Sequence, residues 1–322
     1  MAPVIDIRRI LIFLAFACGI AWGSALVVYL TGGLTGSPVI EPTTGLTLAF
    51  VLVAGPYMFA PAIASLLTRL ITREGFREPY LRLNFRRAWP YWLAAWFGPG
   101  LMTVAGGAVF FLLFPAYFDP TLGTLREMIE QSAQASGQVV PLSVEAIALL
   151  QAVQGILIAP LINSLFTFGE ELGWRAYLQP RLMPLGPRRA LLLMGAIWGL
   201  WHWPVIAMGH NYGLDYPGAP WTGVLMMCWF TLVVGIFLGW TALRSQSVWP
   251  AVIGHAALNG IAGLAIFFAQ DKPNPLLGPM PVGIIGSAGF ALVALLILLT
   301  PRALAAPAGM AAGTSVPADP AS

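Results

Sequence analysis

The chain has 322 residues, of which 58% are hydrophobic and only 9% charged, and its net charge is +3. Soluble domains carry roughly 25% charged residues, so the composition excludes an ordinary soluble protein and predicts that lipid is the main solvent. Nucleic acid is not an expected partner, because the arginines flank apolar runs and do not form a basic face of their own.

Eight apolar runs are each close to the ~20 residues that a helix needs to cross a bilayer. They cover residues 10–31, 46–70, 89–114, 146–169, 190–209, 220–243, 248–269 and 281–300. The first run exceeds the roughly 7 to 15 residues of a cleavable signal's apolar region, so we interpret it as a retained helix. The pattern predicts an all-α, polytopic integral membrane protein with about eight transmembrane helices.

Basic residues sort to alternate loops, and this asymmetry predicts orientation in a membrane. One set of loops holds 14 of the 16 Lys and Arg residues, at positions 8, 9, 69, 73, 77, 82, 86, 87, 175, 181, 188, 189, 244 and 302, whereas the other holds only Arg126 and Lys272. The arginine-rich side is therefore predicted to be cytoplasmic, with both termini on that side. We expect a multi-pass protein of the bacterial cytoplasmic membrane.

The same pattern suggests a division of the chain. Residues 1–144 would form three transmembrane helices and an outer loop, which we expect to be a short amphipathic or irregular cap. Residues 145–270 would form the functional core, and 271–305 the last transmembrane helix. Residues 306–322 are mostly small, polar or proline and predict a disordered tail. Cys18 and Cys228 lie inside apolar runs and suggest no disulfide framework.

Three apolar runs carry polar residues, which are costly inside a membrane and indicate function. These residues are Glu170, Glu171, Arg175, His202, His255 and Asn259. A spacing of four places Glu171 beside Arg175, and it lets His255 and Asn259 point into one cavity. Counted from the flanking arginines at ~1.5 Å per residue, Glu170, His202 and His255 all lie roughly 16 to 20 Å deep.

In this order, the motifs resemble those of the CAAX-protease and bacteriocin-processing family of intramembrane endopeptidases. The resemblance covers roughly residues 145–270 and rests on Glu170-Glu171-x-x-x-Arg175, Trp198-x-x-x-His202 and His255-x-x-x-Asn259. Trp198 stands where the family usually has Phe, and Ala176 where Gly commonly follows the motif arginine. The first change puts substrate fit in question more than chemistry.

The resemblance implies a glutamic-type endopeptidase without a cofactor. Glu170 would activate a water molecule with help from His202. His255 and Asn259 would donate to the oxyanion, and Glu171 and Arg175 would be supporting residues. The expected partners are the lipid bilayer and a peptide or protein substrate that enters from the membrane or the cytoplasmic side.

Other interpretations remain open. Glu171 and Arg175 could form a structural ion pair, His202 could belong to an interfacial belt, and His255 with Asn259 could join helices by hydrogen bonds. Glu170, His202 and His255 also form a possible zinc set. A transporter or binding protein is a further alternative. We interpret His210 as a solvated loop residue. The tryptophans near the motifs, at 174, 198, 201 and 203, could either line an apolar groove or simply pack.

Overall fold

The computed structural model describes residues 5–137 and 141–305, and almost all of its regular structure is helical. The first half contains α1 (Ile7–Leu30), β1 (Val39–Glu41), β2 (Leu46–Thr47), α2 (Leu48–Leu52), a π-helix (Val53–Tyr57), α3 (Met58–Thr72), α4 (Phe85–Leu113) and α5 (Gly123–Ser136). The second half contains α6 (Val144–Leu157), α7 (Ala159–Glu171), a π-helix (Leu172–Leu178), α8 (Gln179–Leu182), α9 (Pro187–Trp201), α10 (Trp203–Ala207), α11 (Trp221–Ser245), α12 (Trp249–Ile261) and α13 (Ala288–Leu299). Short 3-10 helices cover Pro79–Leu81, Pro115–Tyr117, Met183–Leu185 and Leu264–Phe268.

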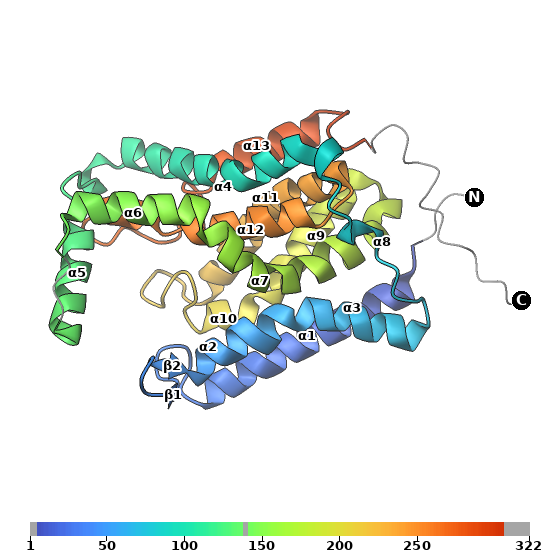
Figure 1. Cartoon of the computed structure of the whole chain (residues 1–322), viewed down its shortest axis with the longest axis horizontal. Helices are drawn as coiled ribbons and strands as arrows, with labels where there is room; N and C mark the ends of the chain where they lie inside the picture. Colours follow the sequence, from blue (N-terminus) through green and yellow to red (C-terminus); the bar gives the residue numbers. More distant parts are fainter. Residues whose placement is uncertain (1–4, 138–140, 306–322) are drawn as a thin grey trace, which may run out of the picture.

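The long helices lie side by side along one direction (Figure 1). Helices α1 and α3 pack together at one edge, and α4 and α13 at the opposite edge. Between them, α7 packs against α12 and α9 against α11. The all-α, polytopic prediction is therefore confirmed, and the helices in the middle are those that carry the polar motifs.

Fewer helices than eight are long and apolar enough to cross a membrane. In the described part of the chain, five qualify by length and composition, and the count reaches six if α6 and its continuation through Leu185, bent by 47°, are taken as one span. The run 190–209 is divided, because α9 ends at Trp201 and the short helix α10 begins at Trp203, with Pro204 in its first turn. Only α13, with 12 residues, forms in the run 281–300. The count of eight spanning helices is thus not confirmed.

The arginine-rich loops meet at one end of the molecule. Glu74 Oε2 lies 2.6 Å from Arg181 Nη2 and 3.5 Å from Arg9 Nε, so one carboxylate joins two of these loops to the start of α1. Arg244 Nη1 donates to the Arg302 carbonyl at 3.2 Å, at the end of α13. Both described ends of the chain therefore lie at the arginine-rich end. Its assignment to the cytoplasm rests on the charge rule.

Helix α5 lies across the other end of the bundle (Figure 1). It buries Leu125 and exposes Arg126, Glu127 and Glu130. This arrangement matches the amphipathic cap expected for the outer loop. The predicted disordered tail, residues 306–322, lies outside the described residues.

Candidate active site

Helix α7 is fixed against α12 by a row of polar side chains. Asn163 Nδ2 donates to the carbonyl of Ala256 at 3.3 Å, and Thr167 Oγ1 donates to that of Val252 at 3.0 Å. Glu171 follows Thr167 by four residues and so lies on the same face. It therefore meets the stretch of α12 that contains His255.

Glu171 accepts two hydrogen bonds on one oxygen. Arg175 Nη1 donates to Glu171 Oε1 at 3.0 Å, and His255 Nδ1 lies 2.9 Å from the same oxygen. Glu171 and Arg175 are fully buried, and His255 is 6% exposed. The prediction that Glu171 pairs with Arg175 is confirmed. The pair belongs to a larger group, because it also holds the imidazole of a neighbouring helix.

Trp198 connects the two remaining polar residues of the buried site. Its indole Nε1 donates to Glu170 Oε2 at 2.8 Å, and His202 Nδ1 lies 2.8 Å from its backbone carbonyl oxygen. A carbonyl can only accept, so His202 Nδ1 must carry a proton. In neutral His202, Nε2 is then the unprotonated nitrogen. Glu170 and His202 have no hydrogen bond to each other within the described residues.

The predicted common depth of the three motifs agrees with these contacts. Trp198 links Glu170 and His202, and its ring centroid lies 5.2 Å from that of His255. Asn259 does not join this group. It is exposed, whereas His255 one turn earlier is buried, so the expectation that the two side chains point into one cavity stays a prediction.

Glycines allow the helices that carry the site to approach closely. A Cβ at Gly195 would lie 2.7 Å from the Cα of Leu232, and one at Gly199 would lie 2.6 Å from the Cα of Cys228. This Gly-x-x-x-Gly pattern on α9 therefore sets its contact with α11. Sequence reasoning overlooked the pattern, although the spacing of four was visible and is typical of close helix packing in membranes.

The N-terminal helices hold the end of α9. Tyr57 Oη and Trp22 Nε1 both donate to the carbonyl of Trp201, at 2.7 and 3.1 Å. His202 is the next residue, so α1 and the π-helix before α3 position the second motif. Residues outside the predicted core of 145–270 thus contribute to the geometry of the site, and no sequence signal distinguished them.

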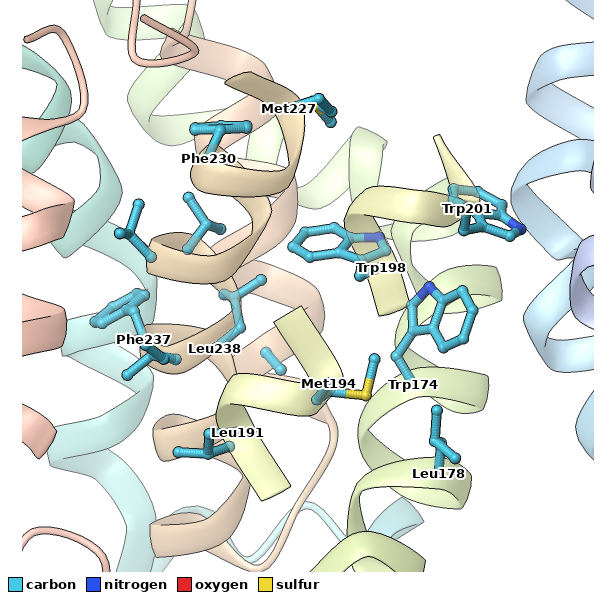
Figure 2. Close-up of a cluster of buried hydrophobic side chains, with 14 of the residues drawn as sticks. Trp174, Leu178, Leu191, Met194, Trp198, Trp201, Met227, Phe230, Phe237 and Leu238 are labelled. Carbon is cyan, nitrogen blue, oxygen red and sulfur yellow. The ribbon is translucent and has the colours of Figure 1, made fainter. Parts of the chain in front are cut away.

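The tryptophans near the motifs mainly pack. Trp174, Trp198 and Trp201 are at most 2% exposed. Figure 2 shows their indoles within one cluster of buried hydrophobic side chains. Trp203 is half-buried, with Nε1 3.5 Å from Cys228 Sγ. The groove interpretation therefore does not apply to the three buried rings. His210 is exposed, as expected of a loop residue.

The described side chains do not form a ready-made metal site. Within residues 5–137 and 141–305, no three His, Cys, Asp or Glu side chains gather closely enough to hold a metal ion. His202 Nδ1 and His255 Nδ1 bond a carbonyl and Glu171, which leaves Nε2 of each ring unbonded, and Glu170 has no direct hydrogen bond to either imidazole among the described residues. We therefore derive no catalytic step through a metal.

The fold and the site together define a polytopic membrane protein with a buried group of carboxylates and imidazoles. Residues 146–261 match the family described as type II CAAX prenyl endopeptidase, Rce1-like. Over 96 residues the chain is 34% identical to CAAX prenyl protease 2 of Methanococcus maripaludis, a match that covers 28% of this chain and 34% of that protein. The chain thus spans about a third of the length of this curated relative.

The matched segment contains all three motifs. Residues 146–261 are therefore similar to the CAAX-protease and bacteriocin-processing family, which is the family that the motifs resemble.

Proposed function

We propose that this protein is an intramembrane endopeptidase in which Glu170 activates the attacking water. The observation that carries the proposal is the different bonding of the two adjacent carboxylates. Glu171 bonds Arg175 and His255 through Oε1, and its Oε2 is buried without a partner, whereas Glu170 has no ion pair within the described residues and accepts one hydrogen bond on Oε2, from the neutral indole of Trp198. A general base needs a carboxylate that no cation neutralises and that has an oxygen within reach of a water molecule.

His202 would assist Glu170 by accepting a proton. Its Nδ1 donates to the Trp198 carbonyl, so Nε2 of the neutral ring presents a lone pair. Two groups that can each take a proton then both bond Trp198, Glu170 at the indole Nε1 and His202 at the backbone carbonyl. They would serve in turn as water loses one proton and the leaving amine gains one.

His255 and Asn259 would stabilise the oxyanion of the tetrahedral intermediate. Because Glu171 holds His255 Nδ1, Nε2 is the nitrogen left to face a substrate, and it can donate when the ring is doubly protonated. Asn259 is exposed and offers an amide N–H₂ one turn away on α12. We infer that substrate entering from the membrane or the cytoplasmic side meets Asn259 before the buried residues.

The name of the matched relative suggests a substrate class. We propose peptides that end in a prenylated Cys-aliphatic-aliphatic-X motif, whose lipid would lie in the bilayer beside the site. The test uses two forms of one such peptide, farnesylated and unmodified, with the purified full-length protein in lipid vesicles. Mass spectrometry of the products identifies the bond that is cut.

We expect cleavage of the farnesylated peptide and its loss in the His202→Ala variant, because the proton acceptor is then absent. A matched control is Glu127→Gln, which changes an exposed glutamate of α5. Equal cleavage of both peptides would contradict the proposed prenylated substrate class, while the proposed peptidase activity would stand. Unchanged cleavage by a folded His202→Ala protein would contradict the role of His202.

A further inference from the structure

Trp198 contacts every buried polar residue of the site except Glu171. Besides its bonds to Glu170 and His202, its ring lies under the guanidinium of Arg175, whose Cζ is 4.4 Å from the ring centroid, and it meets the imidazole of His255 edge to face. Trp198 is 2% exposed. Its indole is therefore held in one place by packing on all sides.

The indole N–H determines how Glu170 is oriented. An indole nitrogen donates and cannot accept, so the 2.8 Å contact with Glu170 Oε2 requires an accepting carboxyl oxygen. With Oε2 held, rotation of the carboxylate is restricted, and Oε1 is the oxygen presented to water. Phenylalanine, the usual residue at this place in the family's motif, has no donor and could not hold Glu170 in this way.

The rest of the residue acts on the neighbouring groups. The Trp198 carbonyl accepts from His202 Nδ1, which directs Nε2 of that ring away from the helix. The face of the indole attracts the guanidinium of Arg175, whose Nη1 donates to Glu171 and not to Glu170. Trp198 therefore contributes to a difference between the two carboxylates. Glu171 pairs with the Arg175 cation, and Glu170 accepts a hydrogen bond from the neutral indole.

We propose that Trp198 is a positioning residue that aligns Glu170 with His202 through its indole N–H and its backbone carbonyl. The proposal rests on the assignment of Glu170 as the water-activating base. It concerns the indole N–H specifically, and this separates it from the general packing role of a buried tryptophan.

Two changes at position 198 isolate the N–H group. Trp198→Phe removes it together with part of the ring, and replacement by benzothienylalanine removes it while keeping the bicyclic shape. The matched control is Trp174→Phe. Trp174 is fully buried in the same cluster, but its Nε1 has no hydrogen-bond partner among the described residues.

Both changes at Trp198 should lower kcat about 10- to 100-fold, since a misaligned base costs rate at this scale, and they should leave KM within about twofold. Trp174→Phe should keep kcat within about twofold of wild type. Wild-type kcat in the benzothienylalanine protein would overturn the proposal. So would an equal loss at position 174, because a packing effect would then explain both.

An infrared measurement tests the hydrogen bond without turnover. The difference spectrum between wild type and Glu170→Gln isolates the Glu170 carboxylate band, and this band should shift when position 198 carries benzothienylalanine. An unshifted band would overturn the proposal even in an active protein. A shifted band in a protein whose Glu170→Gln variant remains active would instead reject the proposed function and retain the contact.

Discussion

At the scale of single residues, the main feature of the site is that two adjacent glutamates have different hydrogen-bond partners. Glu170 and Glu171 follow one another in α7, and the helix turns them toward different neighbours. Glu171 contacts Arg175 and His255, and all three side chains are buried, whereas Glu170 points toward α9 and the indole of Trp198. The buried cation therefore balances Glu171, and Glu170 has no ion pair of its own in the described part of the chain.

The cost of losing that cation can be measured. Arg175→Met should destabilise the protein by about 3–5 kcal/mol, because it leaves Glu171 buried and without a charge partner. The double variant Arg175→Met/Glu171→Gln should recover part of this loss, since no uncompensated charge remains. Thermal unfolding in detergent micelles checks both values. Equal destabilisation of the single and double variants would contradict the pairing.

The sequence predicted the residues of the site better than their contacts. A spacing of four was enough for the Glu171–Arg175 pair, because both residues lie on one helix. The bond from Trp198 to Glu170 could not be predicted, because it depends on how α9 is rotated relative to α7. Asn259 lies one turn from His255, as the spacing of four predicts, but the spacing could not show that packing leaves Asn259 exposed and buries His255.

At the scale of elements, close packing between helices determines where the site residues lie, and a hydropathy pattern does not predict this packing. Apolar runs predicted where helices lie, but Pro204 divides the fifth run, and the eighth yields only the short helix α13. A hydropathy scale sums the free energies of transferring side chains from water to an apolar phase, so it does not register where the backbone of a helix breaks. The contact between α9 and α11 depends instead on Gly195 and Gly199, which bring Trp198 and His202 to their places.

Substitution of Gly195 by Ala tests this contact. Its Cβ would lie 2.7 Å from the Cα of Leu232, so α9 must move away from α11. The move should lower the free energy of unfolding by about 1–3 kcal/mol. We also expect the cleavage rate to fall, because Trp198 and His202 move with α9. The control is Gly100→Ala in α4, where a Cβ meets nothing within 4 Å. Equal activity in the two variants would show that the α9–α11 contact does not position the site.

At the scale of the whole molecule, the arginine-rich end joins the N-terminal helices to the segment that carries the site. Glu74 pairs with Arg9 of α1 and with Arg181 of α8, and Tyr177 Oη donates to it at 2.7 Å. At the level of the site, Trp22 and Tyr57 hold the last turn of α9. The family match begins at residue 146, yet these contacts show that the preceding helices support the site.

The Glu74 group should make stability depend on pH. Burial raises the pKa of Glu74, but the hydrogen bond from Tyr177 and the charge of Arg181 outweigh burial and hold that pKa below its usual range. Its contribution is therefore present above the unfolded-state pKa and is lost as pH falls through the lower, folded-state value. The thermal midpoint of wild type should exceed that of Glu74→Gln at about pH 7, and the two should converge in acid. A difference that does not narrow in acid would contradict this account.

The most direct test of the central claim is the cleavage rate of Glu170→Gln. This change keeps the shape of the side chain and an oxygen that can accept from Trp198, and it removes only the basic carboxylate. With the peptide that wild type cleaves, kcat should fall by about 10²- to 10⁴-fold while the unfolding temperature stays near that of wild type. A folded Glu170→Gln protein that cleaves at the wild-type rate would contradict the account.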